Sequence, residues 1–263
     1  MCRLFGLIAP RPVKITFPLL EAAESLRRQS LLNPDGWGVG YYAGGHAVVR
    51  KQAEAAHGSP GFSRVAEQAR SHLFVAHVRL RTAGGINLAN THPFSYGGWI
   101  LAQNGGIGGA WHKRIKAEIG WGRIAGKTSG EHLLYWLHAR AGHLSGAARD
   151  AAILAAVREL VADPASIGSA NFVLATGDQL YAFRFSPPQG NARSLFYLRR
   201  SPPLAEASPG AAEAEGGIPR TPAVLVASEQ VTGPGEPWQP VANGCLLIAR
   251  CDLSVDLERI AAA

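Results

Sequence analysis

A cysteine at position 2 is the residue of this chain best placed to do chemistry. If the initiator Met1 is removed, Cys2 becomes the mature N-terminus. A thiol, with a free pKa of about 8.5, then lies beside an α-amine with a pKa of about 7.7–8.0. At neutral pH part of that amine can accept the thiol proton, directly or through a water, so no histidine is required. The alternative is that Cys2 is a small apolar residue at the start of a strand. The sequence leaves open whether Met1 is removed.

The dipeptide Asn104-Gly105 is a second candidate, and it follows the apolar residues 99–103. A side-chain amide and a backbone N–H that lie side by side at the end of a strand suit an oxyanion hole. Asn-Gly is also typical of a type I′ hairpin turn. The residues alone leave both interpretations open.

Arg79 and His92 are further candidates. Arg79 ends the mostly apolar residues 73–78, a position from which a charged group usually extends to solvent. His92 precedes Pro93, and its position favours a residue that lines a pocket and fixes a loop. The nine histidines show no HExxH or other metal-ligand spacing. We therefore expect no metal and no cofactor.

Length and cysteine usage limit the fold. A chain of 263 residues, 47% of them hydrophobic, can bury a substantial core, and we expect one domain over residues 1–263. Three cysteines are an odd number, and none form a CxxC pair. Cys245 and Cys251 would be about 20 Å apart in an extended strand, too far for a disulfide. A disulfide framework and a zinc site are both disfavoured.

Charge and hydropathy restrict the partners. The net charge is +7, but the basic residues are scattered in ones and twos and are not interleaved with aromatic residues. This pattern favours a solvated surface over a nucleic-acid site. The chain has no apolar run of about 18 residues and no basic, apolar leader at its N-terminus. We expect no membrane association and a cytoplasmic protein.

Hydrophobic periodicity predicts alternating strands and helices. The predicted strands cover residues 3–9, 37–42, 46–51, 73–79, 98–103, 171–176, 179–185, 194–199, 222–227 and 245–250. The predicted helices cover residues 17–29, 61–70, 129–142 and 146–162. The irregular residues 81–97, held between strands, are a usual place for substrate contacts. Residues 202–220 have linker composition and predict a mobile surface insertion.

Five short motifs occur in the order found in one enzyme family. They are Cys2-Arg3-Leu4-Phe5-Gly6, Asp35-Gly36-Trp37-Gly38, Ala76-His77-Val78-Arg79, Asn90-Thr91-His92-Pro93-Phe94 and Asn104-Gly105. Together they resemble class II glutamine amidotransferase domains, and the chain is similar to the small, stand-alone branch of that family. Residues 227–232 and 236–238 also resemble this branch. The matches span most of the chain.

The resemblance implies a fold and a set of roles. It implies the α+β fold of N-terminal-nucleophile hydrolases, a four-layer αββα sandwich of two antiparallel sheets between helical layers. It also implies that Cys2 is the nucleophile, that Asn104 and Gly105 form the oxyanion hole, and that Arg79 binds the α-carboxylate of glutamine. His92 is expected close to the substrate.

One position departs from the family pattern. Members carry a motif like Thr-Asp-Ser-Glu whose aspartate holds the α-ammonium of glutamine, whereas this chain has Ser129 at the aspartate position. The hydroxyl should remove roughly 1.5–3 kcal/mol of charge-assisted hydrogen bonding. Ser129 would line the substrate site, or it simply caps a helix. Glu131 could substitute as the carboxylate, although helix geometry turns it to another face.

The expected activity is hydrolysis of a glutamine or γ-glutamyl side-chain amide through a thioester on Cys2, with release of ammonia or an amine. Because no second catalytic domain is visible, ammonia would need an accepting enzyme supplied in trans. One alternative is hydrolysis of an amide that lacks a free α-amine. A third is a catalytically degenerate binding protein of the same fold, which the serine at position 129 favours and the intact Cys2, Arg79, Asn104 and Gly105 disfavour.

Overall fold

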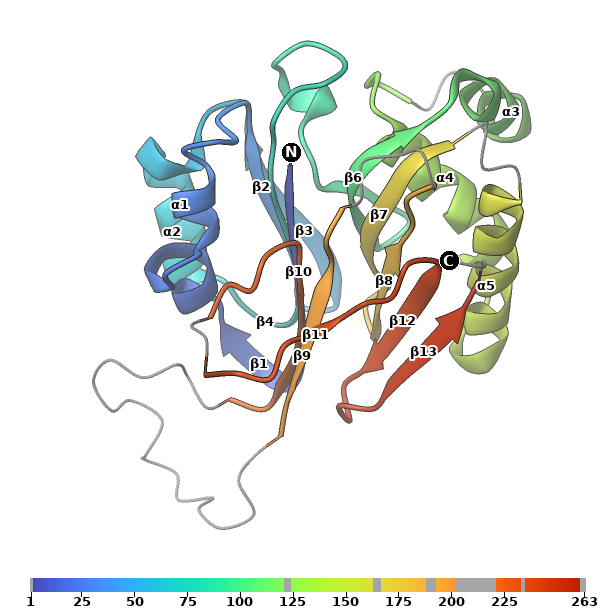
Figure 1. Cartoon of the computed structure of the whole chain (residues 1–263). Helices are drawn as coiled ribbons and strands as arrows, with labels where there is room; N and C mark the ends of the chain where they lie inside the picture. The colour runs from blue at the N-terminus through green and yellow to red at the C-terminus, as the bar shows by residue number, and fades with distance from the viewer. Residues whose placement is uncertain are drawn as a thin grey trace.

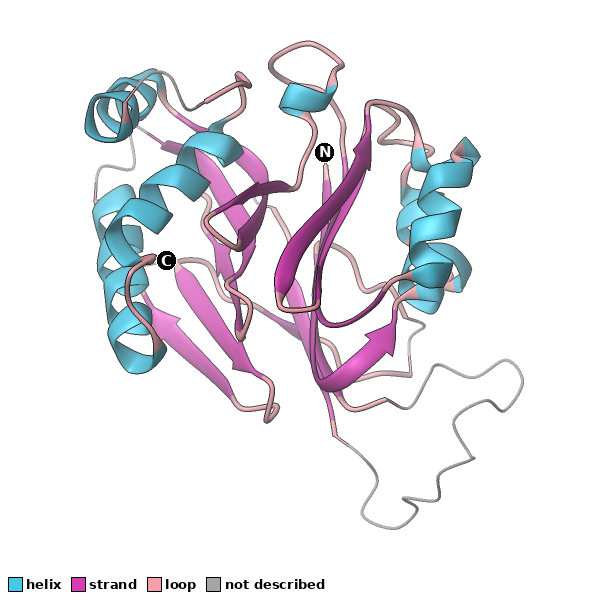
Figure 2. Cartoon of the chain, turned by 180° about the vertical axis from the view of Figure 1, so that it is seen from behind, coloured by secondary structure: helices cyan, strands magenta, loops and turns pink. Residues whose placement is uncertain are grey.

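The computed structural model describes residues 2–120, 124–162, 167–187, 193–201, 221–232 and 235–260. The insertion predicted at residues 202–220 lies outside these ranges. Two antiparallel sheets lie face to face between two helical layers (Figures 1 and 2). This is the expected four-layer arrangement.

The first sheet has seven strands in the order β11-β9-β10-β1-β4-β2-β3. The central strand β1 pairs with β10 on one side and with β4 on the other, and Cys2 immediately precedes it. The strands are β1 (Arg3–Lys14), β2 (Trp37–Ala43), β3 (His46–Gln52), β4 (Arg70–Val78), β9 (Phe196–Arg200), β10 (Ala223–Ala227) and β11 (Gln239–Pro240).

The second sheet has six strands in the order β13-β12-β8-β7-β6-β5. Its strands are β5 (Phe94–Tyr96), β6 (Trp99–Ile107), β7 (Ile167–Ala175), β8 (Gln179–Arg184), β12 (Cys245–Arg250) and β13 (Val255–Arg259). Strand β6 pairs with β5 and β7. The candidate pair Asn104-Gly105 lies near the end of β6.

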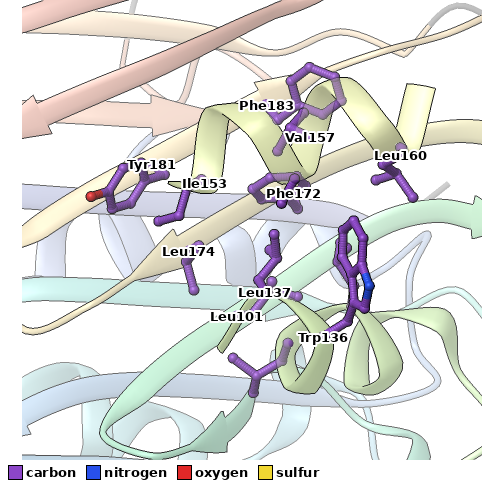
Figure 3. Packing of buried hydrophobic residues seen from close by; sticks show 14 of the residues in the cluster. Leu101, Trp136, Leu137, Ile153, Val157, Leu160, Phe172, Leu174, Tyr181 and Phe183 are labelled. Carbon is purple, nitrogen blue, oxygen red and sulfur yellow. The ribbon is translucent and has the colours of Figure 1, made fainter. Parts of the chain in front are cut away.

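Helices cover the outer face of each sheet (Figure 2). The first sheet is covered by η1 (Phe17–Glu21), α1 (Leu26–Gln29) and α2 (Pro60–Gln68), and the second by α3 (Gly109–Ile119), α4 (Ser129–Ala141) and α5 (Gly146–Val161). Two short 3-10 turns, η2 (Ala56–Gly58) and η3 (Leu88–Asn90), lie in the connections. Figure 3 shows the side chains that α4 and α5 pack onto the second sheet.

Strand β1 shows how the sequence produces these layers. Side chains alternate along a strand, so Leu4 and Ile8 enter the core between the sheets while Phe5 and Leu7 pack under the helices. Because both faces are covered, the strand reads as an unbroken apolar run. At Gly6 the sheets approach closely, since an added Cβ would lie 2.7 Å from Val173 Cγ1. Strand β1 therefore lies close against the second sheet four residues beyond Cys2.

Some predicted elements differ from the structure. The helix predicted over residues 17–29 is interrupted, because the chain extends at Ala22 and a new helix begins after Ser25, whose side chain accepts from the Arg28 N–H. Helix α3 and strands β5, β11 and β13 were not predicted. Only Trp111 and Ile115 of α3 are buried, so its apolar periodicity covers a single turn.

In the ranges that the structure describes, no helix is long and apolar enough to cross a lipid bilayer. The same ranges contain no group of three or more histidine, cysteine, aspartate and glutamate side chains able to hold a metal ion.

Two neighbouring histidine rings are buried in the molecule, one on β4 and one just before β5. His77 on β4 is fully buried, and its ring centroid lies 4.6 Å from that of His92. His92 also contacts the Phe94 ring edge to face at 4.6 Å. Burial lowers the pKa of His77 to about 3, and burial with the neighbouring His77 lowers the pKa of His92 well below its usual range. Both rings are therefore neutral in the folded protein.

Folding stability should consequently fall in mild acid. Below a pH of about 6.5 the two histidines bind protons in the unfolded chain but stay neutral in the folded one. Their contribution to stability is therefore complete above a pH of about 6.5 and is lost as the pH falls toward the folded pKa values. Each histidine contributes a slope of about 1.4 kcal/mol per pH unit in that window. Urea unfolding between pH 7 and pH 4.5 measures the slope. His77→Asn should reduce it, whereas His46→Asn on the exposed part of β3 should not; equal slopes in all three proteins would contradict this assignment.

Candidate active site

All six residues predicted to form the site line one cavity. Its volume is about 390 Å³, and it opens where the start of β1, the end of β4, the end of β6 and the start of α4 meet. Two larger grooves of about 690 and 660 Å³ lie elsewhere on the molecule and include none of the six. The six residues are Cys2, Arg79, His92, Asn104, Gly105 and Ser129.

The thiol of Cys2 lies against the backbone that follows β4. Its Sγ is 3.3 Å from the Leu80 carbonyl oxygen, to which it can donate, and 3.3 Å from the Leu80 nitrogen, whose N–H donates to it. Burial raises the pKa of the Cys2 thiol, although the Leu80 N–H and the positive charges of Arg79 and Arg193 oppose this shift. At neutral pH the buried thiol is therefore protonated, and a nucleophilic role requires a base close by.

Asn104 and Gly105 do not form a hairpin turn. They continue β6, where Asn104 pairs with Asn171 and Gly105 with Ala170 of β7, and the register shifts only beyond Gly105. The Asn104 side-chain Nδ2 donates to the Cys2 carbonyl oxygen at 2.8 Å. The turn interpretation is wrong, and the amide of Asn104 lies beside the cysteine.

Gly105 has a backbone that only glycine tolerates there. Its φ is +132°, and an added Cβ would lie 1.7 Å from the Ser169 carbonyl oxygen. Any side chain would therefore force β6 and β7 apart next to the cavity.

Arg79 is buried, with only 3% of its surface exposed, so the interpretation in which it extends to solvent is wrong. Its Nη1 donates to the Gly85 carbonyl at 2.9 Å and its Nη2 to the Ala83 carbonyl at 2.7 Å. It forms no ion pair with a carboxylate in the ranges that the structure describes. A guanidinium held by neutral carbonyls in a cavity wall can still receive an anion.

His92 forms part of the cavity wall beside α4. Both of its ring nitrogens are buried and find no hydrogen-bond partner among the described residues. The first turn of α4 packs onto the ring, because a Cβ on Gly130 would lie 2.2 Å from His92 Nε2. The neutral ring supplies shape rather than charge.

Ser129 is the first residue of α4, and Thr128 occupies the N-cap position without a side-chain cap hydrogen bond. The interpretation of Ser129 as the helix cap is therefore wrong. The Glu131 carboxylate accepts the N–H groups of Ala125 and Gly126, at 3.1 and 2.7 Å, so it fixes the preceding loop instead of facing the substrate site. The described residues that line the cavity include no carboxylate.

Arg193 is a cavity residue that the sequence analysis missed. Its Nη1 donates to Asn104 Oδ1 at 2.6 Å, and its Nε donates to the Ser169 hydroxyl. It is 89 residues from Asn104 in the chain and lies just before β9. No local sequence pattern predicts this contact.

Comparison with known proteins identifies the family. A family model described as class II glutamine amidotransferases matches residues 1–259. The chain is 38% identical over 117 residues to a γ-glutamyl-hercynylcysteine sulfoxide hydrolase of Mycobacterium tuberculosis, a match that covers 40% of this chain and 49% of that protein. The chain thus spans about half the length of this curated relative.

Solved structures share the fold at low sequence identity. A class II glutamine aminotransferase domain protein of Silicibacter pomeroyi superposes with a TM-score of 0.64 at 20% identity, covering 99% of this chain and 100% of that one. Glutamine phosphoribosylpyrophosphate amidotransferase of Bacillus subtilis gives a TM-score of 0.63 at 18% identity, covering 100% of this chain and 50% of that one. The predicted four-layer fold of two antiparallel sheets between helical layers is confirmed, and with the family model matching residues 1–259 the chain belongs to the class II glutamine amidotransferase family.

Proposed function

We propose that this protein is an amidohydrolase that uses Cys2, freed as the N-terminus, to cleave a glutamine-type or γ-glutamyl side-chain amide through a thioester. The observation that carries the proposal is the 2.8 Å hydrogen bond from Asn104 Nδ2 to the Cys2 carbonyl, which sets an amide donor beside the thiol. Arg79 faces the same cavity without a carboxylate partner among the described residues.

Activation of the nucleophile requires removal of Met1. Because burial raises the pKa of Cys2, the thiol needs a local base, and the α-amine of the freed N-terminus is that base. It takes the thiol proton as sulfur attacks the amide carbonyl carbon. The carbonyl oxygen gains the negative charge, which Asn104 Nδ2–H and the Gly105 N–H stabilise.

Collapse of this intermediate breaks the C–N bond. The α-ammonium returns its proton to the leaving nitrogen, which departs as ammonia from a primary amide or as an amine from a substituted one. The amine then takes a proton from water, whose oxygen attacks the thioester, and the acid and free thiol are regenerated. With glutamine the products are glutamate and ammonia, and a separate enzyme would have to take up the ammonia.

A second substrate class is favoured by one observation. The described cavity lining contains Arg79 and Arg193 but no carboxylate, and Glu131 is occupied by two backbone N–H groups. An α-ammonium would therefore lack a charged partner, whereas an α-carboxylate would find one in Arg79. An amide whose α-nitrogen is acylated fits this charge distribution better than free glutamine.

Replacement of Cys2 tests the nucleophile. Cys2→Ala should abolish amide hydrolysis with little loss of stability, because one sulfur at a chain end contributes little packing. Cys2→Ser should retain a trace, since a hydroxyl is a weaker nucleophile at neutral pH. Cys251→Ala, which removes another partly exposed thiol, is the matched control and should keep full activity. Undiminished hydrolysis by Cys2→Ala would remove Cys2 from the mechanism, and no hydrolysis by wild type would favour a binding protein.

Two substitutions separate catalysis from binding. Asn104→Ala should lower kcat by about two to three orders of magnitude with a smaller change in KM, because the donor acts on the oxyanion. Arg79→Lys should mainly raise KM, since one ammonium cannot replace a planar guanidinium on a carboxylate. Steady-state release of p-nitroaniline from γ-glutamyl p-nitroanilide measures both. A change in KM alone for Asn104→Ala would refute the oxyanion role.

The serine at position 129, where the family has an aspartate, predicts which substrate the protein prefers. Ser129→Asp should tighten L-glutamine by roughly ten- to a hundredfold, because it restores a carboxylate for the α-ammonium. The same change should weaken N-acetyl-L-glutamine, which leaves that carboxylate unpaired. Ser129→Asn is the uncharged control. Tight binding of glutamine by wild type, unimproved in Ser129→Asp, would show that another group holds the ammonium.

A further inference from the structure

Arg193 contacts both strands that border the proposed oxyanion site. Its Nη1 donates to Asn104 Oδ1 on β6 at 2.6 Å, and its Nε donates to the Ser169 hydroxyl on β7. The carbonyl of the same Ser169 is the atom that an added Cβ at Gly105 would strike. One guanidinium thus contacts Asn104 itself and Ser169, the residue against which Gly105 packs.

The contact decides which way the Asn104 amide faces. A guanidinium donates hydrogen bonds and accepts none, so it must meet the Oδ1 end of the amide. The Nδ2 end then faces Cys2, where one of its hydrogens is donated to the Cys2 carbonyl. The other Nδ2 hydrogen is left for the substrate. With the amide reversed, an oxygen would face the developing oxyanion and repel it.

Within the described ranges Arg193 forms no ion pair, and its side-chain acceptors are an amide oxygen and a hydroxyl. Burial lowers the pKa of Arg193, with the nearby Cys2 as the opposing influence. A partly buried positive charge on the oxygen of an amide draws electrons from its N–H groups and strengthens them as donors.

We propose that Arg193 is a positioning residue for catalysis: it orients and polarises the Asn104 amide so that Nδ2–H donates to the tetrahedral oxyanion. This inference rests on the proposed oxyanion role of Asn104. Because Arg193 acts through Asn104, its removal should cost little once Asn104 is already absent. An arginine that only supported the fold would lower the activity by a similar factor whether or not Asn104 is present.

The experiment is a double-mutant cycle with Arg193→Met, Asn104→Ala and the double variant, assayed on γ-glutamyl p-nitroanilide. Arg193→Met should lower kcat about ten- to a hundredfold with KM changed less than threefold. In the Asn104→Ala background the same change should cost less than threefold. Arg193→Lys should recover part of kcat, because it keeps the charge but cannot reach both acceptors. Arg200→Met, which removes the ion pair between Arg200 at the end of β9 and Glu236, is the matched control.

Alkylation of Cys2 by iodoacetamide is the second readout. This reaction forms no oxyanion, so its rate and pH profile should be nearly the same in wild type and Arg193→Lys, which keeps the positive charge that opposes the rise in the Cys2 pKa. Additive losses in the cycle, a rise in KM instead of a fall in kcat, or a loss of alkylation in Arg193→Lys that parallels its loss of kcat would each overturn the inference. Failure of the proposed function looks different, because wild type itself would then release no p-nitroaniline.

Discussion

The hydrogen bond between the Asn104 side chain and the Cys2 carbonyl is the constraint on which the site depends, because it joins the two sheets. Cys2 enters β1, the central strand of the first sheet, and Asn104 lies on β6 of the second. The bond at 2.8 Å is possible because the sheets approach closely beneath it, where Gly6 leaves room for Val173. A larger residue at position 6 would separate the thiol from the amide without touching either.

The charged side chains among the described residues that line the cavity are all cations. The thiol is buried and neutral, the His92 ring in the wall and the His77 ring next to it are neutral, and the cations are Arg79, Arg193 and the exposed Lys127. Among the described lining residues no carboxylate balances them. Cations that are taken out of water without a paired anion are costly, so a ligand that brings negative charge relieves that cost. The proposed reaction supplies it twice, as the substrate carboxylate and as the oxyanion.

The sequence was most informative where chemistry depends on short motifs. Cys2 and Asn104-Gly105 were recognisable because each borders a run of apolar residues. The strands at the centres of both sheets and helices α4 and α5 were predicted from such hydrophobic patterns. Layer order followed from the family resemblance rather than from periodicity, which carries no information on which strands pair.

Other features depend on tertiary contacts and escaped prediction. Arg79 is an arginine at a strand end, a position that usually extends to solvent, yet the loop carbonyls of Ala83 and Gly85 bury it. Arg193 contacts Asn104 only because the tertiary structure places the residues just before β9 beside β6 and β7. The break between η1 and α1 reflects the packing of two short turns on the first sheet, which overrides a continuous helical pattern.

The central claim is that Cys2 is a processed N-terminal nucleophile, and mass spectrometry of the purified protein tests it most directly. The intact mass is measured before and after incubation with a chloromethyl ketone analogue of glutamine, and the modified peptide is sequenced. The account predicts a chain that lacks Met1 and gains one adduct, located on Cys2, while Cys245 and Cys251 stay unmodified. A retained Met1, or an adduct on Cys251 in place of Cys2, would contradict it.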